Sequence, residues 1–341
     1  MKKIDIKSLD LEQLVEYTKS IGLKSFTAKQ IYQWLHQKNA VDFTQMTNLS
    51  KPVRETLAQE CEITKLTIKQ KQVSTDGTVK YLYELFDGNC IETVLMRYDH
   101  GNSICVSSQV GCRMGCTFCA STQGGKLRDL TTGEILSQLY ETENDIGERV
   151  SNIVLMGIGE PLDNFDNVVK FIKIISSIDG KNISQRNISL STCGIVPRIY
   201  ELAQLKMGIT LSISLHATTN EARKKTMPVT NTYSLDKLMA ACRDYTKQTG
   251  RRISFEYAMI KGVNDTQEDA QRLSQLLKGF INHVNLIPIN PVDGSPYSQS
   301  DGKVIREFQD KLTQLKVNAT IRRRLGQDIS AACGQLRNEH R

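Results

Sequence analysis

The stretch QVGCRMGCTFCAS, residues 109–121, decides the fold of this chain. It carries Cys112, Cys116 and Cys119 with the spacing C-x3-C-x2-C, and three thiolates on one short loop can bind one metal centre. A structural zinc site uses four ligands, and no further cysteine or histidine follows at the spacing of a zinc finger. A [4Fe–4S] cluster held by three cysteines leaves one iron open to a small chelating molecule. We therefore expect an iron–sulfur cluster here, with a structural zinc or iron site as the alternative.

This spacing resembles the signature of the radical S-adenosylmethionine superfamily, in which an aromatic residue such as Phe118 commonly precedes the last cysteine. In that superfamily the amino and carboxylate groups of S-adenosylmethionine chelate the open iron. One electron from the cluster then splits the sulfonium and gives a 5′-deoxyadenosyl radical. The resemblance implies a [4Fe–4S] cluster and S-adenosyl-L-methionine as cofactors.

Outward from this loop the chain divides into three parts. Residues 1–62 carry apolar side chains at helical spacing, which predicts a small helical accessory domain. Residues 63–97 are rich in β-branched and aromatic residues and predict a β-rich connecting segment. The third part, residues 98–337, is the expected core domain with the C-terminal cysteine segment. Between residue 63 and about residue 108, three short stretches can turn hairpins: TDGT at 75–78, FDGN at 86–89 and DHGN at 99–102.

After residue 130, apolar strands alternate with amphipathic helices. Such alternation predicts a parallel sheet covered by helices. About six repeating units favour a partial barrel over a full eightfold one. The expected fold class is α/β, a partial (βα)6 barrel of the radical S-adenosylmethionine type with the accessory domain and the connecting segment attached.

Polar residues and glycines follow several of these strands, where a barrel places its site. A carboxylate can accept from an ammonium group, and hydroxyls, an imidazole or an amide can hold a ribose, a carboxylate or an adenosine. For Gly157 and Gly159 the alternative is a plain strand-to-helix turn, and for His216 a structural role. The strand-end residues are Gly159, Glu160, Ser191, Ser214, Leu215, His216 and Asn290.

Composition narrows the possible classes of protein. The chain has 341 residues, 39% of them hydrophobic and 24% charged, with no apolar run near the roughly 20 residues of a membrane helix. Its N-terminus lacks the apolar region of a secretory signal. We therefore expect a cytoplasmic protein that does not associate with a membrane. Nine cysteines in a reducing compartment do not predict a disulfide framework. The net charge of +7 fits a polyanionic partner, with 224–225, 251–252 and 322–324 as phosphate contacts or, alternatively, solvated surface.

Seven motifs together resemble one family in order and spacing. They are GNSICVSSQVGCRMGCTFCAS, MGIGEPLDN, ISLHA, MPV, FEYAMIKGVND, VNLIPINP and IRRRLGQDISAACGQL. Over about residues 90–337 the chain is similar to the RlmN family, the dual-specificity rRNA/tRNA adenine C2-methyltransferases. The resemblance implies that Cys112, Cys116 and Cys119 bind the cluster and that the seven strand-end residues contact S-adenosylmethionine.

The same resemblance gives roles to three further residues. Because C2 of adenine is electron-poor and has no lone pair, it cannot attack a methylsulfonium directly. In the family one S-adenosylmethionine methylates the cysteine at Cys333, and a second gives the radical that removes hydrogen from this methyl group, so each turnover uses two. Glu92 matches the proton acceptor, and Cys105 matches the thiol that releases the product through a transient disulfide. Without the family resemblance, the favoured interpretation of Cys105, which lies on an apolar strand, is a small buried hydrophobic residue.

The other cysteines, Cys61, Cys90, Cys193 and Cys242, match no role and are interpreted as structural thiols. One departure from the family is Ser330, where an acidic residue is usual. If the roles hold, Cys333 lies within reach of the open face of the cluster with Cys105 close by, or else its segment is mobile.

The implied partners are 23S rRNA, at an adenosine of the peptidyl-transferase centre, and tRNA, at the adenosine beside the anticodon. An electron donor such as a flavodoxin-type reductant is implied as well, and we expect a monomer. One alternative is the C8-methylating relative, Cfr, although the prolines of GEPL at 159–162 and LIPINP at 286–291 favour the C2 enzymes. Another is a non-catalytic RNA-binding protein that keeps a metal for structure.

Overall fold

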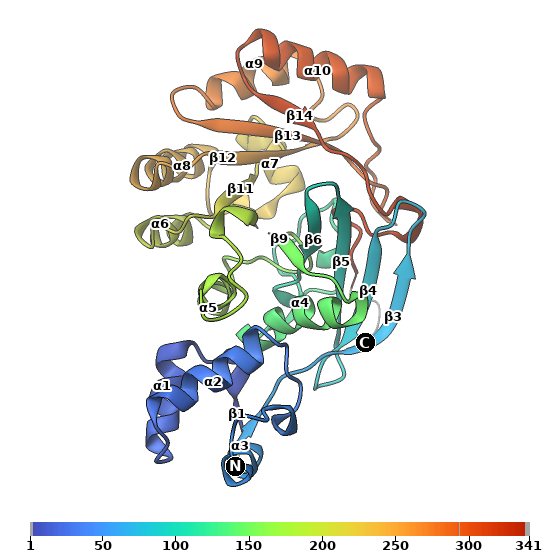
Figure 1. Cartoon of the computed structure of the whole chain (residues 1–341). Helices are drawn as coiled ribbons and strands as arrows, with labels where there is room; N and C mark the ends of the chain where they lie inside the picture. The colour runs from blue at the N-terminus through green and yellow to red at the C-terminus, as the bar shows by residue number, and fades with distance from the viewer. Residues whose placement is uncertain (1–2, 293, 338–341) are drawn as a thin grey trace.

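The structure is a computed structural model that describes residues 3–292 and 294–337, and one ten-stranded sheet organises it (Figure 1). The strand order is β14-β13-β12-β11-β10-β9-β6-β5-β4-β3. All neighbours from β14 to β6 pair in parallel, and the remaining pairs are antiparallel. The strands are β3 (Thr67–Val73), β4 (Val79–Glu84), β5 (Cys90–Tyr98), β6 (Gly101–Cys105), β9 (Val150–Leu155), β10 (Ile188–Thr192), β11 (Thr210–Ser214), β12 (Ile253–Met259), β13 (Asn282–Pro288) and β14 (Ala319–Ile321).

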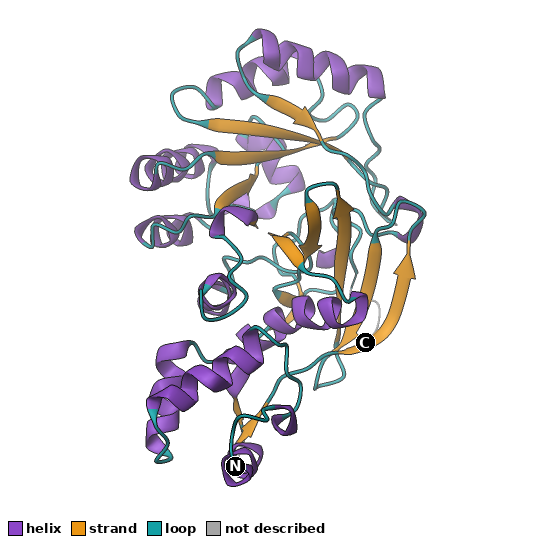
Figure 2. Cartoon of the chain, in the orientation of Figure 1, coloured by secondary structure: helices purple, strands orange, loops and turns teal. Residues whose placement is uncertain are grey.

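Helical crossovers join the parallel strands, because parallel neighbours cannot be linked by a tight turn. Six such crossovers lead from β6 to β14 in the described residues, which confirms the partial (βα)6 barrel. Figure 2 shows the helices along the outer side of the curved sheet. They are α4 (Thr132–Ile146), α5 (Phe165–Ser176), α6 (Val196–Gln204), α8 (Leu235–Thr249), α9 (Gln267–Leu276) and α10 (Gly302–Gln314), and the short α7 (Asn220–Thr226) precedes α8.

Local sequence explains where these helices begin. Thr131 caps α4 and Thr266 caps α9, each in a capping box with an acidic residue three positions on, Glu134 and Asp269. The apolar side chains that follow at helical spacing are buried against the strands, as Leu139 of α4 is. Each crossover therefore packs on the sheet and leaves the carboxyl ends of the strands at one edge.

The N-terminal residues form a small helical unit that packs on α4. It contains α1 (Leu11–Ser20), α2 (Ser25–His36), α3 (Lys51–Glu60) and the two-stranded sheet of β1 (Ile4–Asp5) and β2 (Cys61–Glu62). Two buried polar contacts join it to α4. Lys7 Nζ donates to Ser137 Oγ at 2.9 Å, and His36 Nδ1 lies 2.9 Å from the Tyr140 hydroxyl. Burial lowers the pKa of Lys7 to about 8 and that of His36 to about 3.

Strands β3, β4 and β5 form two hairpins, and β5 pairs with β6 in a third. The turns lie at the three stretches that the sequence indicated, so those predictions are confirmed. Because β5 pairs with β6, the connecting segment extends the barrel sheet with antiparallel strands. The shorter hairpin of β7 (Gln109–Gly111) and β8 (Lys126–Asp129) brackets the cysteine loop.

Residues 322–337, called the strap below, leave β14 at one edge of the sheet and cross to the β3–β4 turn near the other edge (Figure 1). There Asp76 Oδ2 accepts from the Gly326 amide at 2.8 Å, and Asp328 Oδ1 accepts from Ser74 Oγ at 2.5 Å. The strap then returns to the cysteine loop, where the Ala120 amide donates to the Gly334 carbonyl at 2.8 Å. It therefore spans the opening of the partial barrel.

No helix within the described residues combines the length and the apolar character that crossing a membrane requires.

Candidate active site

Two adjoining cavities lie between the carboxyl ends of the strands and the strap. The first, called the cluster cavity, is lined by the cysteine loop and the strand ends, and the second, called the strap cavity, lies between the strap and β5 and β6. The residues that line both are Met156, Ile287, Asn290, Arg322 and Cys333. Cys333 can therefore contact a ligand in either cavity.

Most of the residues singled out from the sequence line the cluster cavity. Cys105 and Glu92 lie elsewhere, as described below, and Leu215 is the exception among the strand-end residues. Its side chain is buried in the core, and its backbone amide donates to the Glu256 carbonyl at 3.0 Å. The residues brought together here are Cys112, Cys116, Cys119, Gly159, Glu160, Ser191, Ser214, His216, Asn290 and Cys333.

The cysteine loop is held by its own backbone and by its neighbours. The Cys112 amide donates to the Gly125 carbonyl at 3.0 Å, and the Thr117 amide donates to the Thr226 carbonyl at 3.0 Å. Within the described residues, no three His, Cys, Asp or Glu side chains lie close enough together to hold a single metal ion. A tetrahedral zinc site requires that closeness, whereas in a cubane each thiolate binds a different iron. The described residues therefore show no such closed zinc set around the cysteine loop.

Burial raises the pKa of the Cys112 thiol to about 12 and also raises the pKa values of Cys116 and Cys119. The other two loop cysteines add to the rise at Cys116, and all three cysteines line the cluster cavity. Such thiols stay protonated unless a cationic centre binds them as thiolates. This donor set suits an iron–sulfur cluster.

Glu160 follows β9 and is buried at the wall of the cluster cavity. Its Oε2 accepts from the Cys193 amide at 2.7 Å and its Oε1 accepts from the Leu162 amide at 3.0 Å. Burial raises the pKa of this carboxyl, and the two amide donors oppose the rise. The carboxylate is thereby fixed in orientation and can accept a further hydrogen bond from an ammonium group.

His216 stands just past β11 with a φ of 55°, so the chain turns sharply there. Its Nδ1 accepts from the Ala258 amide at 2.9 Å, and burial lowers its pKa to about 3. The imidazole is therefore neutral with its proton on Nε2. Asn264 fixes this bend, because its Nδ2 donates to the carbonyls of both His216 and Ala258. His216 thus has the structural role that the sequence left open, and it lines the cavity too.

Asn290 supplies a test of whether the cavity suits a nucleoside. Its Nδ2 donates to the Cys333 carbonyl at 3.1 Å, whereas its buried Oδ1 has no hydrogen-bond partner. A buried acceptor without a partner costs free energy, so a ligand that donates to it is favoured there. The amino group of an adenine or a ribose hydroxyl meets this need. Together with Glu160 and the three thiols, the residues fit a [4Fe–4S] cluster and S-adenosylmethionine.

Gly159 is needed where the chain passes over β7. Its φ is +105°, and a Cβ built on it would lie 2.6 Å from Gln109 Cβ and 2.8 Å from Gln109 N. We expect Gly159→Ala to lower the free energy of unfolding by about 1–3 kcal/mol from backbone strain alone. We expect it also to weaken the binding of S-adenosylmethionine, because Glu160, whose amide donates to Gln109 Oε1, must shift. Thermal unfolding and equilibrium dialysis measure the two effects.

Gly250→Ala is the matched control. Gly250 has a φ of +66° at the end of α8, but no atom lies within 4 Å of the position that an added Cβ would take. It should cost about 1 kcal/mol and leave the binding of S-adenosylmethionine unchanged. If both variants bound S-adenosylmethionine as tightly as the unaltered protein, Gly159 would have no part in positioning the cofactor-binding residues.

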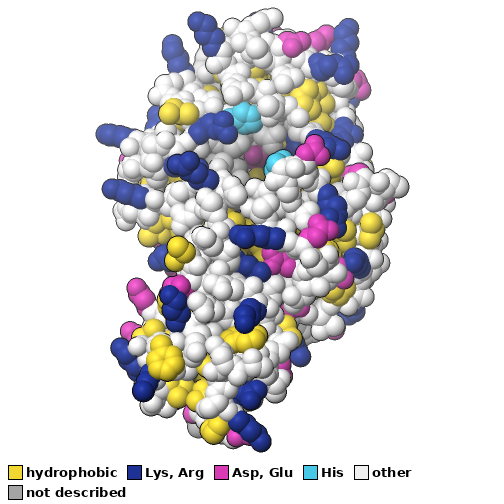
Figure 3. Space-filling view, viewed as in Figure 1, with side chains coloured by type: hydrophobic (Ala, Val, Ile, Leu, Met, Phe, Trp, Pro, Cys, Tyr) yellow, Lys and Arg dark blue, Asp and Glu magenta, His cyan; other side chains and the backbone are white. Residues whose placement is uncertain are grey.

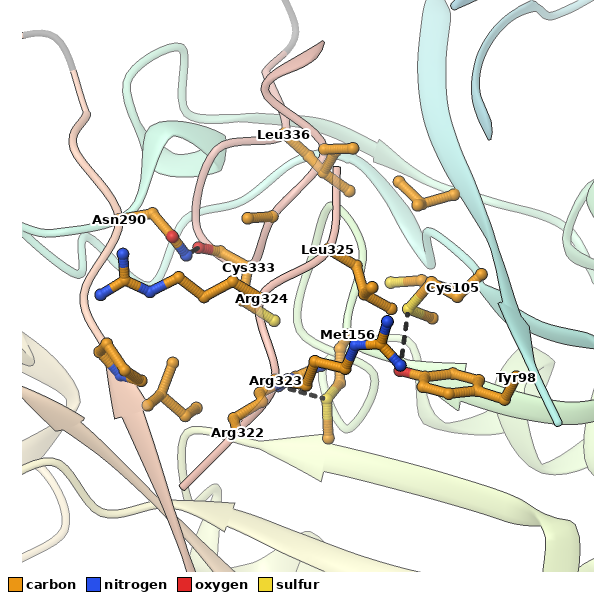
Figure 4. A pocket seen from close by; sticks show the side chains of 16 residues that line it. Tyr98, Cys105, Met156, Asn290, Arg322, Arg323, Arg324, Leu325, Cys333 and Leu336 are labelled. Carbon is orange, nitrogen blue, oxygen red and sulfur yellow. Dashed lines mark hydrogen bonds between the residues drawn. The ribbon is translucent and has the colours of Figure 1, made fainter. Parts of the chain in front are cut away.

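The strap cavity brings two thiols from distant parts of the chain to one space (Figure 4). Cys105 is the last residue of β6, and Cys333 lies on the strap. Burial raises the pKa of Cys105 to about 12, and the nearby Cys333 adds to the rise. Cys333 lines the cluster cavity together with Cys119 and precedes Gly334, whose carbonyl accepts from the Ala120 amide, so it lies next to the cysteine loop. The nine cysteines, all within the described residues, are free thiols.

Glu92 lies on β5 at the edge of this space. It is buried, and its Oε2 accepts from the Arg337 amide of the strap at 2.6 Å. Its Oε1 lies 3.1 Å from Lys80 Nζ. Val94 and Met96 follow on the same face of β5 and line the strap cavity. Glu92 is therefore close to the cavity wall, although it is not among the residues that line it.

The three basic stretches differ in position. Arg251 and Arg252 precede β12 at the amino end of that strand, where Arg251 Nε donates to the Ile209 carbonyl at 3.3 Å, and they line neither cavity. Arg322 faces into both cavities, and the exposed Arg323 and Arg324 lie at the rim of the strap cavity. Lys224 and Lys225 are exposed on α7. Figure 3 shows a hollow in the upper half of the molecule with Lys and Arg side chains around it. Positive charge thus surrounds the opening, as the binding of a polyanion requires.

Sequence reasoning missed some residues that shape the site. Arg223 is fully buried and donates to the carbonyls of Cys193, Ser214 and Leu215, so it holds two strand ends together. In the sequence it precedes two exposed lysines and resembles surface charge. Asn264 belongs to the motif FEYAMIKGVND, and a polar residue after a strand was the available signal.

Comparison with protein families matches two parts of the chain. Residues 4–63 match the model described as the ribosomal RNA large subunit methyltransferase N-terminal domain, and residues 106–274 match the radical SAM superfamily. The second match contains the cysteine loop and the strands β9 to β12.

Individual proteins agree with this over the whole chain. A protein of Lachnoclostridium phytofermentans named "Probable dual-specificity RNA methyltransferase RlmN" is 56% identical over 99% of this chain and 96% of its own length. A protein of Lachnospira eligens with the same name is 52% identical over 98% and 96%. The crystal structure of a radical SAM methyltransferase from Sphaerobacter thermophilus is 40% identical with a TM-score of 0.94, covering 98% of this chain and 100% of that one. The cysteine loop, the barrel and these identities together show that the chain belongs to the RlmN family of radical S-adenosylmethionine enzymes.

Proposed function

We propose that this protein methylates C2 of adenosine in RNA through a methyl group carried on Cys333. Its substrates are an adenosine of the peptidyl-transferase centre in 23S rRNA and the adenosine beside the anticodon in tRNA. The observation that carries the proposal is the placement of Cys333, which lines both cavities, with Cys105 in the strap cavity and the cysteine loop in the cluster cavity.

The cluster cavity is the proposed cofactor site. Cys112, Cys116 and Cys119 would hold a [4Fe–4S] cluster, and Gly159, Glu160, Ser191, Ser214, the backbone at Leu215, His216 and Asn290 would hold S-adenosyl-L-methionine. When bound, these cofactors supply a methyl group and a 5′-deoxyadenosyl radical, from two S-adenosylmethionine molecules per turnover. An electron donor such as a flavodoxin-type reductant supplies the electron.

The chain's own residues then perform the transfer. Cys333 accepts the methyl group on its sulfur. After this S-methyl group has lost a hydrogen atom, Cys333 presents its carbon to the adenine. Glu92 accepts the proton from C2 of the adenine bound to that carbon. Cys105 attacks the sulfur of Cys333, and the bond from that sulfur to the transferred carbon breaks with its electron pair left on the carbon, which takes up a proton and becomes the methyl group. External thiols then reduce the resulting disulfide.

Several features support C2 rather than C8 as the target. Pro161 of the motif GEPL lines the cluster cavity, and Pro288 of the motif LIPINP lines the strap cavity. These are the motifs in which the chain resembles the C2 enzymes. Relatives named as dual-specificity RNA methyltransferases support the two RNA substrates. The protein is proposed to act as a monomer.

The test is anaerobic reconstitution of the protein with iron and sulfide, followed by incubation with S-adenosylmethionine, a reductant and RNA. We expect 5′-deoxyadenosine and 2-methyladenosine in the digested RNA, both detected by mass spectrometry. A product with 8-methyladenosine alone would make the protein a C8 enzyme. A protein that binds RNA and forms neither compound would instead be the non-catalytic alternative.

A further inference from the structure

Lys80 is a nearly buried charged residue for which the proposed reaction has no role. It lies on β4 diagonally across from Glu92 on β5, since Lys80 pairs with Val94 and Leu82 pairs with Glu92. Side chains of such neighbours project from the same face of a sheet. Lys80 Nζ is 3.1 Å from Glu92 Oε1, and the two side chains are only 12% and 11% exposed. Water screens this ion pair far less than a surface pair, so the pair restricts the orientation of the carboxylate.

Both members of this pair also contact the strap. Lys80 Nζ lies 3.5 Å from the carbonyl oxygen of Ser330, and Glu92 Oε2 accepts from the Arg337 amide at 2.6 Å. Ser330 and Arg337 lie on either side of Cys333 in the sequence. The ion pair therefore bridges the sheet to both flanks of the segment that carries the methyl group.

We propose that Lys80 is a positioning residue for proton transfer, which fixes the Glu92 carboxylate relative to the strap and so relative to an adenine attached to Cys333. This inference rests on the proposed function. In the step concerned, the C2–H bond of the attached adenine breaks. Its proton passes to a carboxylate oxygen of Glu92 and its electron pair stays in the ring. The unpaired electron that radical addition leaves on the adduct passes to the proposed iron–sulfur cluster, which serves as the one-electron acceptor. A carboxylate held at one oxygen by an ammonium group has fewer orientations to search before it meets that hydrogen.

Removing the charge while keeping the side chain's bulk should affect this step alone. In Lys80→Met we expect S-methylation of Cys333 to proceed as in the unaltered protein, while the rate of RNA methylation falls about 10²-fold. The adenine should then accumulate as a covalent adduct with the protein. Peptide mass spectrometry measures the S-methyl group, and a denaturing gel measures the adduct.

A deuterium label separates proton transfer from a general loss of structure. With RNA that carries deuterium at C2 of the target adenosine, the rate of product formation by Lys80→Met should fall further, because breaking of the C2–H bond now limits turnover. Lys80→Arg should restore most of the rate, since a guanidinium can still pair with the carboxylate.

Lys69→Met is the matched control. Lys69 lies on β3 and pairs with Glu84 at 3.1 Å in the same sheet, but this pair is 46% and 39% exposed. Lys69→Met should leave the S-methyl group on Cys333, the amount of adduct, the rate of RNA methylation and the isotope effect unchanged. If Lys80→Met lost S-methylation and RNA methylation together, with no isotope effect, Lys80 would only support the strap and the inference would be wrong. If the unaltered protein formed no S-methyl group on Cys333, the proposed function would fail and this inference with it.

Discussion

Cys333→Ala should abolish RNA methylation completely. The thiol is the proposed carrier of the methyl group, and no other cysteine lines both cavities in the part of the chain that the structure describes. The cluster should still assemble, because the loop cysteines that would hold it are unchanged. Anaerobic reconstitution, the visible absorbance of the cluster and mass spectrometry of digested RNA measure these outcomes together.

The same experiment needs a cysteine that is remote from the site. Cys242 lies on α8, is fully buried and lines neither cavity. Cys242→Ala should cost about 1 kcal/mol of stability through the small cavity that it leaves, and it should retain RNA methylation. Normal methylation by Cys333→Ala would rule out a methyl group carried on this residue, whatever the behaviour of the control.

Cys105→Ala should trap the RNA on the protein. Without this thiol, nothing breaks the bond between the sulfur of Cys333 and the carbon joined to the adenine. S-methylation of Cys333 should proceed, because Cys105 lines only the strap cavity and leaves the cluster cavity intact. We expect a covalent complex in about one-to-one ratio and free methylated RNA below one turnover.

A denaturing gel with labelled RNA detects that complex, and digestion with peptide mapping places it on Cys333. Cys90→Ala serves as the control, since Cys90 is a buried cysteine at the start of the neighbouring strand β5 and lines neither cavity. Multiple turnovers by Cys105→Ala would show that another nucleophile releases the product.

The sequence was informative where the relevant residues are close together in the chain. The spacing of Cys112, Cys116 and Cys119 predicts a shared loop, and the alternation of strands and helices predicts the partial barrel that the structure contains. Polar residues after apolar strands, such as Glu160 and Ser214, could be assigned to one cavity because parallel strands end at the same edge.

Alternation along a strand explains why Leu215 differs from its neighbours. Ser214 and His216 line the cluster cavity, whereas the intervening Leu215 is buried in the core. Successive side chains of an extended chain project to opposite sides, so the apolar residue between two polar ones was the one to expect in the core. A contact of Leu215 with the cofactor would involve its backbone.

What the sequence does not reveal are contacts between distant segments. Lys80 and Glu92 meet across a hairpin, and both meet a strap that follows much later in the chain, with sequence separations of 250 and 245 residues. No periodicity or motif predicts these contacts, because they depend on the path of the strap from one edge of the ten-stranded sheet to the other. Arg223 was missed for a similar reason, since its burial depends on strand ends from two different units.

The strap also has a consequence for the order of folding. Its contacts join residues that are far apart along the chain: Gly326 bonds to Asp76 across 250 residues and Asp328 bonds to Ser74 across 254. Contacts of such large sequence separation form late, because the entropy of closing the loop must be overcome first. A partly folded chain therefore contains the cysteine loop and the sheet before Cys333 reaches them. Refolding kinetics should show Cys105 and Cys333 losing their reactivity toward an alkylating reagent in the slowest phase.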